Sequence, residues 1–146
     1  MISRTEDSQY HGMTVNSFTS VSIEPPLVLI CADNRSETFK AVEASGRFTV
    51  SILSEDHQAL SQQFAIKGPQ AALFQSLNLH WGADHIPYLA DGLAFLDCAL
   101  DRIIPAGDHF LVLGRVTAFG RLHPGRPLLY YQSHYHHLEA SPELQG

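Results

Sequence analysis

The order of hydrophobic and polar residues predicts a chain built mainly from β-strands. Residues 47–53 alternate between apolar and polar side chains, which predicts a half-buried strand. Residues 93–100 are mostly apolar at both alternating positions, as in a strand covered on both sides. The apolar run at residues 27–31 predicts a strand buried on both faces, and residues 110–119 predict a further strand. A last paired segment is expected at residues 128–131 and 134–138.

Helical patterns are short and few. Phe39, Val42 and their apolar neighbours have helical spacing, Ser36 is placed as an N-cap, and Gly46 is a natural stop. Two more short helices are expected from residue 54 to residue 64 and over residues 71–77. Because strands and turn clusters recur at regular spacing, the pattern predicts an all-β barrel decorated by short helices.

The alternation of apolar and polar residues is interrupted within the stretch from Gly12 to Ile30. Residues 13–16 alternate as a strand does, but the alternation slips at Ser17 within a run of hydroxyl side chains. A strand that breaks its alternation in this way is either a bulge or a close approach to something polar. Pro25 and Pro26 then stop local pairing because they lack a backbone donor.

Composition and charge limit the classes of protein to which this chain can belong. A chain of 146 residues fits one domain, with a short polar lead at residues 1–11 and a loose polar tail at residues 139–146. The net charge of −6, without a basic cluster, argues against nucleic acid or an anionic membrane as a partner. The charged fraction of 16% suggests that a partner, such as a second copy, covers part of the surface. Cys31 and Cys98 lie in apolar runs and predict buried thiols of a cytoplasmic protein.

Four constellations could carry chemistry. The first is the run of short polar side chains from Asn16 to Ser20, for which composition alone favours hydroxyls that face solvent on an ordinary strand. The turn at residues 33–38 opens a helix and offers N–H donors, the hydroxyls of Ser36 and Thr38, and the charge of Arg35, which suits a phosphate. A plain helix cap is the commoner explanation of such a turn. His109 follows a turn and enters a strand, so it either points into a pocket mouth or caps that turn. Nine histidines raise the possibility of metal, and His134 would share a strand face with the histidine two residues on, but a polar strand edge explains them better.

Taken together, the motifs of this chain resemble those of the flavin reductase-like family, the FMN-binding split barrels that reduce free flavin with NADH or NADPH. The matching segments occur in order from about Gly12 to about Leu138. They are residues 12–22, 25–28, 33–38, 47–54, 64–65, 107–109, 114–116 and 127–131.

The resemblance implies a mainly β fold, a Greek-key FMN-binding split barrel with a few short helices that forms a homodimer. It implies FMN as the flavin, with FAD as an alternative, NADH or NADPH as the hydride donor, and a flavin-dependent monooxygenase as the partner that uses the reduced flavin. The cofactor-binding residues that it implies are Asn16, Ser17, Phe18, Thr19, Ser20, Asp33, Asn34, Arg35, Ser36, Thr38, Phe64 and Tyr135, and it places His109 beside the reacting rings as the catalytic residue. Asp33 has the wrong sign for a phosphate contact, and capping the turn is its alternative role.

The start of the chain departs from the family pattern. Family members carry a helix and a strand before the Gly12 motif, whereas here only residues 2–4 could represent the end of that strand. The N-terminal helix is therefore expected to be missing. The alternative hypothesis that follows is a flavin-binding or truncated family member without reductase activity.

Overall fold

A computed structural model describes residues 1–139 of the chain. Its elements in chain order are β1 (Ile2–Arg4), β2 (Tyr10–Gly12), β3 (Thr19–Ser22), β4 (Leu27–Asp33), α1 (Glu37–Ser45), β5 (Arg47–Ile52), η1 (Glu55–His57), α2 (Gln58–Ala65), α3 (Ala71–Gln75), β6 (Leu79–Trp81), η2 (Ala83–His85), β7 (Pro87–Leu89), β8 (Ala94–Ala106), β9 (His109–Arg121), β10 (Leu129–Tyr131) and β11 (His134–His136). Strands dominate and the helices are short, which confirms the mainly β class.

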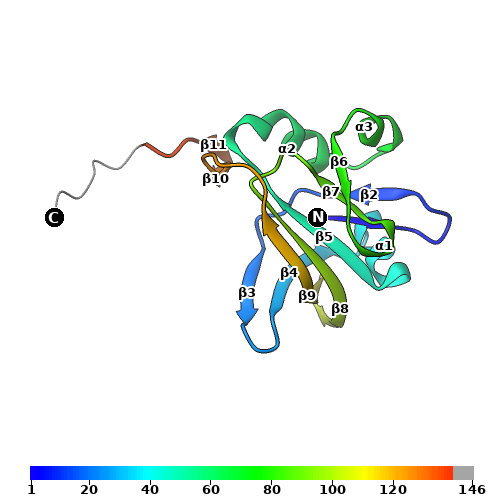
Figure 1. Cartoon of the computed structure of the whole chain (residues 1–146). Coiled ribbons are helices and arrows are strands. Elements are labelled where there is room, and N and C mark those ends of the chain that lie inside the picture. The colour runs from blue at the N-terminus through cyan, green and yellow to red at the C-terminus, as the bar shows by residue number, and fades with distance from the viewer. Residues whose placement is uncertain (140–146) are drawn as a thin grey trace.

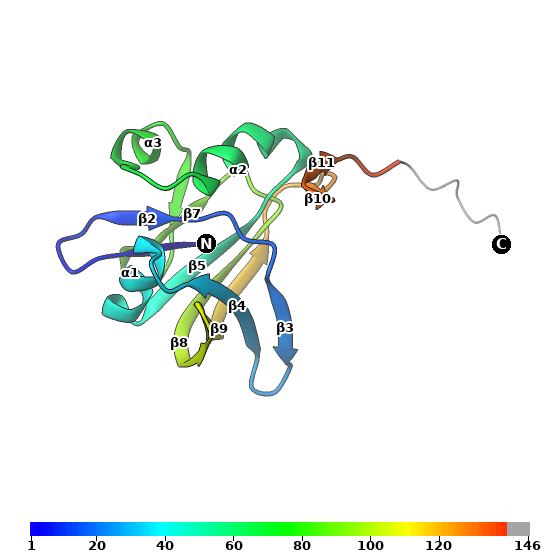
Figure 2. The same ribbon diagram turned by 180° about the vertical axis from the view of Figure 1, so that it is seen from behind.

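Seven strands form one antiparallel sheet in the order β2-β1-β5-β8-β9-β4-β3. The long hairpin of β8 and β9 lies between β5 and β4, so strands that follow one another in the chain are not all neighbours in the sheet. The β3–β4 hairpin and the tip of the β8–β9 hairpin extend from one end of the molecule, and α2 and α3 lie at the other (Figure 1). The opposite view shows α1 beside the first strands of the sheet (Figure 2).

Two groups of buried side chains hold these elements together. The larger group lies between α1 and the sheet and includes Phe39, Phe48 and Val112. The smaller group joins the β1–β2 hairpin to α2 and α3 through Ile2, Phe64 and other apolar residues. The sheet therefore has both α1 and the α2–α3 region packed on it, and the space between them is where the site lies.

The sequence predicted a polar lead at residues 1–11, but these residues form most of a β-hairpin. β1 and β2 pair antiparallel, and β1 joins the main sheet by pairing with β5 at Thr49. Met1, Ile2 and Ser3 are buried. β1 occupies residues 2–4, which the family resemblance had suggested as the end of a strand, whereas β2 was not expected.

Other local predictions are confirmed or corrected. Ser36 caps α1 and Gly46 adopts the left-handed conformation that ends it. The strand expected over residues 13–16 is wrong, since β2 ends before it and β3 begins at Thr19. β4 is not fully buried on both faces, because its residues alternate between buried and half-buried. The tail expected at residues 139–146 falls almost entirely outside the described residues.

The remaining predictions concern the cysteines and the membrane. Cys31 and Cys98 are both free thiols, of which Cys98 is buried and Cys31 half-buried, and burial raises the pKa of Cys98 to about 12. No helix within residues 1–139 has the length and the apolar character that a membrane span requires.

Candidate functional site

A cleft of about 530 Å³ lies where three segments meet. Its walls are the irregular segment after β2, the turn between β4 and α1, and the loop that follows α2. His109, at the start of β9, lies at its border. The volume is in the range of small-molecule sites, which are usually about 300–1,000 Å³.

The β4–α1 turn gives this cleft its polar end. The Ser36 hydroxyl accepts a hydrogen bond from the Phe39 N–H at 3.3 Å, which is the cap interaction that begins α1. The N–H groups of Glu37 and Thr38 in the first helical turn have no acceptor within the helix. The helix dipole adds partial positive charge at the same place. This end of the cleft therefore attracts an anion.

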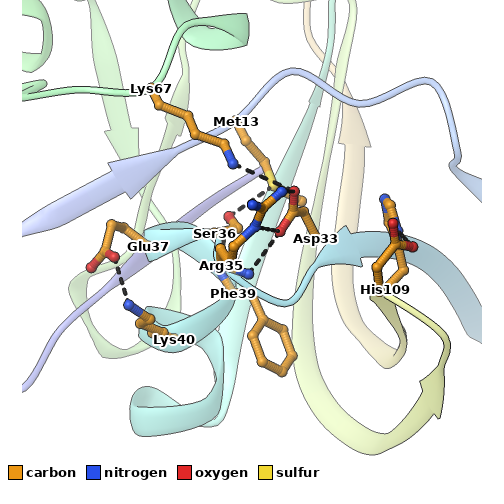
Figure 3. Close-up of polar contacts among 10 residues, drawn as sticks. Met13, Asp33, Arg35, Ser36, Glu37, Phe39, Lys40, Lys67 and His109 are labelled. Atoms are coloured by element: carbon orange, nitrogen blue, oxygen red, sulfur yellow. Dashed lines mark hydrogen bonds and ion pairs between the residues drawn. The ribbon is translucent and has the colours of Figure 1, made fainter.

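Two cations and one carboxylate surround the turn (Figure 3). The Arg35 Nε lies 3.4 Å from Asp33 Oδ1, and the Lys67 Nζ lies 3.4 Å from Asp33 Oδ2. The Arg35 backbone N–H donates to Asp33 Oδ1 at 2.7 Å. This backbone hydrogen bond, then the guanidinium and the ammonium, hold the pKa of Asp33 well below its usual range, while Asp33 raises the pKa of Arg35. Asp33 thus caps the turn, which is the alternative role that its negative charge had suggested.

His109 lies on β9, the strand beside the one that carries Asp33 (Figure 3). It is the register partner of Asp33 in the β4–β9 ladder, so the sheet fixes its position. Its Nδ1 lies 2.7 Å from Asp108 Oδ1, and this hydrogen bond lowers the pKa of Asp108. The imidazole is half-exposed, and it is therefore accessible to a ligand at the mouth of the cleft.

The irregular segment after β2 is held by side-chain hydrogen bonds in place of a strand ladder. The Ser17 hydroxyl donates to the carbonyl of Cys31 and accepts from its N–H, both at 3.1 Å. The Thr14 hydroxyl donates to the Ser61 carbonyl at 2.6 Å, and the Thr14 N–H donates to the carbonyl of Phe64 at 3.1 Å. The interrupted alternation in the sequence therefore reflects a segment that is attached to β4 and to α2 by hydrogen bonds.

A second cavity, of about 410 Å³, lies on the other side of this segment. Residues 13–16, Phe64 and Ala65 border both cavities. The second cavity is lined largely by apolar side chains, and Tyr135 of β11 closes one side of it. The Tyr135 hydroxyl lies 2.9 Å from the Ser61 hydroxyl, which ties the β10–β11 hairpin to α2.

The structure brings most of the predicted site residues together. Those that line the first cleft are Asn16, Ser17, Asp33, Arg35, Ser36, Thr38, Phe64 and His109. Those that line the second cavity are Asn16, Phe18, Phe64 and Tyr135. Thr19, Ser20 and Asn34 line neither cavity, and all three are exposed.

Further polar residues of the first cleft were missed, among them His11, Glu37, Lys67 and Gln70. Gln70 bonds both backbone groups of Gly12, because its Oε1 accepts from the N–H and its Nε2 donates to the carbonyl, each at 2.8 Å. No local pattern marks Lys67 or Gln70, since the loop after α2 meets the cleft only through the tertiary fold. The one signal was the positive charge of Lys67 just after the Phe64-Ala65 motif.

The histidine-rich hairpin was the other candidate. His134 Nδ1 lies 2.7 Å from the Gln132 carbonyl and His136 Nε2 lies 3.1 Å from the Tyr131 carbonyl, so both rings have backbone partners. Among residues 1–139, no three His, Cys, Asp or Glu side chains are grouped as metal ligands would be. The hypothesis of a metal centre gains no support from this part of the chain.

Comparison with known proteins adds an independent observation. The sequence pattern of the flavin reductase like domain matches residues 1–139. A probable flavin reductase of Rhizobium meliloti is 41% identical over 108 residues, which are 74% of this chain and 34% of that protein. The reductase subunit HsaB of a flavin-dependent monooxygenase from Rhodococcus jostii is 33% identical, over 95% of this chain and 70% of that protein.

Solved structures agree with these sequence matches. The styrene monooxygenase flavin reductase of Pseudomonas putida S12 superposes with a TM-score of 0.85 at 30% identity, over 97% of this chain and 89% of that one. Component B of a nitrilotriacetate monooxygenase from Mycobacterium thermoresistibile superposes with a TM-score of 0.88 at 33% identity, over 99% of this chain and 82% of that one.

Proposed function

Because the chain belongs to the flavin reductase-like domain family, we propose that it is an NAD(P)H:flavin oxidoreductase that supplies reduced flavin to a partner monooxygenase. The observation that carries this proposal is the first cleft. The β4–α1 turn gives it the donors and cations that a phosphate requires, and short polar residues of the segment after β2 and His109 also line it.

The residues of the cleft fit a flavin mononucleotide. Ser36, Thr38 and the free N–H groups at the start of α1 are hydrogen-bond donors for a phosphate, and Arg35 and Lys67 supply positive charge. Asn16 and Ser17 would border the ring, where short side chains allow close approach. Because the polar end is suited to a single phosphate group, FMN is our first choice of flavin and FAD the alternative.

The role of the chain in the reaction is to bind and to orient. A bound flavin accepts a hydride from reduced nicotinamide, so the chemistry itself resides in the two small molecules. Ser36, Thr38 and Lys67 would fix the phosphate end of the flavin. His109, fixed by the sheet at the open border of the cleft, would position the nicotinamide of NADH or NADPH. The gain in rate would come from alignment of the two rings and from exclusion of water.

We also propose a homodimer and a cytoplasmic location. The exposed apolar side chains Ile23 and Phe119, at 90% and 78% exposure, are the kind of surface that a second copy would cover. The mass measured by light scattering would test this: twice the chain mass supports the dimer, and a monomer at micromolar concentration contradicts it.

The test of function is oxidation of NADH and of NADPH in air, followed at the nicotinamide absorbance band, with FMN, FAD or riboflavin added. We expect turnover that depends on added flavin. A parallel titration of flavin fluorescence measures binding alone. Binding without turnover would contradict the reductase and support the alternative of a non-catalytic flavin-binding protein, and neither binding nor turnover would refute both.

Two lysine variants sharpen this test. Lys67→Met removes a cation that lines the cleft, so we expect a higher KM for FMN and little change for riboflavin, which has no phosphate. Lys40→Met is the matched control, because Lys40 pairs with Glu37 at 2.7 Å and does not line the cleft. Equal effects of the two variants would contradict a phosphate site at this place.

A further inference from the structure

Asp33 and Glu37 are the two carboxylates that line the cleft, and Asp33 is the one that contacts its cations. Its two oxygens lie 3.4 Å from Arg35 Nε and 3.4 Å from Lys67 Nζ, so the same carboxylate contacts both of the cations at the polar end. A carboxylate and a phosphate are both acceptors for these groups. Any phosphate that binds there must share the two cations with Asp33 or take them from it.

The carboxylate is fixed, whereas its partners can move. Asp33 is the last residue of β4 and accepts a hydrogen bond of 2.7 Å from the Arg35 N–H, and its own carbonyl accepts from the Ser36 N–H at 3.0 Å. The side chains of Arg35 and Lys67 are 79% and 69% exposed, while that of Asp33 is 30% exposed. The cations can therefore turn toward a ligand while the negative charge stays in place.

We propose that Asp33 weakens flavin binding by competing with the flavin phosphate for Arg35 and Lys67, so that flavin is held as an exchangeable substrate. This inference rests on the proposed function, because it concerns how tightly a reductase holds the molecule that it must give up. A reductase that delivers reduced flavin to a separate oxygenase needs a flavin that leaves within each cycle. A carboxylate at the phosphate end provides that property without altering the contacts to the ring.

The charges around Asp33 indicate that its effect on a phosphate would act through Arg35 and Lys67. Asp33 stays ionised throughout the neutral range, since its pKa lies well below the usual value. The other carboxylates of this region have their own partners: Glu37 pairs with Lys40 at 2.7 Å, and Asp108 pairs with His109 at 2.7 Å. Asp33 is therefore the carboxylate that acts directly on the two cations.

The decisive variant is Asp33→Asn, which removes the charge and keeps the side-chain oxygen that caps the turn. We expect the Kd for FMN, measured by fluorescence titration, to fall roughly 3- to 10-fold, as removal of one partly screened negative charge near the phosphate implies. The Kd for riboflavin should not change. FMN should also dissociate more slowly from this variant, and rapid dilution of the FMN complex in a stopped-flow instrument would show this.

The matched control is Glu37→Gln, which makes the same change of charge on a cleft residue that does not contact Arg35 or Lys67. We expect it to tighten FMN binding by much less. In a Lys67→Met background, the effect of Asp33→Asn should shrink, because one of the two contested cations is gone. Thermal unfolding of each variant confirms that the fold is intact.

Four results would overturn the inference. They are unchanged or weaker FMN binding in Asp33→Asn, an equal gain in Glu37→Gln, an equal gain for riboflavin, and an undiminished effect in the Lys67→Met background. Each of these leaves the proposed function standing, provided that the unchanged chain binds FMN. If the unchanged chain binds no flavin at all, the proposed function fails and this inference fails with it.

Discussion

Gly114, in the middle of β9, lies where a side chain of any size would collide with the core. A methyl group built at this position would lie 2.4 Å from Phe48 Cζ, 2.8 Å from Phe48 Cε1 and 3.1 Å from the Cβ of Cys98. Carbon atoms pack at about 3.5–4.0 Å, so the overlap with the ring is about 1 Å. Phe48 and Cys98 are both fully buried, and neither can turn out into solvent.

The expected cost of Gly114→Ala follows from this geometry. Extra methyl groups in a packed core usually cost about 1–3 kcal/mol. The ring of Phe48 lies between α1 and the sheet, and Gly114 pairs with Val28 on β4 and Leu100 on β8, so neither side can yield easily. We therefore expect a loss near the upper end, about 2–3 kcal/mol in the free energy of unfolding. For a domain of this size, that loss lowers Tm by about 5–10 °C.

The assay is urea and thermal unfolding of the purified chain, followed by circular dichroism. Gly125→Ala is the control, since its methyl group would meet only the far end of Leu93 at 3.0 Å. In a Phe48→Leu background the penalty of Gly114→Ala should shrink, because the smaller side chain leaves room. A Gly114→Ala protein that melts within about 1 °C of the unchanged chain would refute the reasoning, and so would a penalty that Phe48→Leu does not reduce.

Three further predictions concern a cleft residue, the cap of α1 and the ion pairs of Glu55. Gln70→Leu removes both hydrogen bonds to Gly12 and should lower the unfolding free energy by about 1–3 kcal/mol, measured in urea, whereas an unchanged midpoint would show that Gly12 does not depend on them. Ser36→Ala should cost about 1 kcal/mol through loss of the helix cap and should weaken FMN more than riboflavin, which parallel titrations would show. Hydrogen bonds from Arg126 and then His137 hold the pKa of Glu55 below its usual value, so their stabilisation is present above about pH 4.3 and is lost as pH falls through the lower folded pKa. Unfolding of the chain and of Glu55→Gln at pH 3 to 7 should therefore differ at pH 7 and converge in acid, and a constant difference would contradict the assignment.

The sequence predicted best those features that depend on near neighbours. The cap at Ser36 and the stop at Gly46 need only residues within one turn of helix, and both are confirmed. The strand over residues 47–53 was evident from its alternation, because one face of β5 is buried more than the other. Candidate ligand residues at the β4–α1 turn came from the same local chemistry, and the structure gathers most of them in one cleft.

Features that depend on distant partners could not be predicted in this way. β2 is only three residues long and is held by pairing with β1, so no pattern of its own marked it. β8 continues through Pro105 to Ala106, beyond the strand predicted at residues 93–100. Its pairing with β5 ends at Ala99, and a missing N–H costs little at a free edge. Lys67 enters the cleft only because the end of α2 lies beside the segment after β2, where the Phe64 carbonyl accepts a hydrogen bond from the Thr14 N–H.

The wall between the two cavities has a thermodynamic consequence. Residues 13–16 border both spaces. They are held by the two hydrogen bonds that Thr14 makes to α2, and by the two hydrogen bonds between the adjoining Ser17 and Cys31 of β4. A ligand that displaces this wall in one cavity changes the free energy of binding in the other. Reciprocity then requires the second ligand to alter the affinity of the first by the same factor. Ligands that displace these four residues would thus occupy the two cavities in one linked equilibrium.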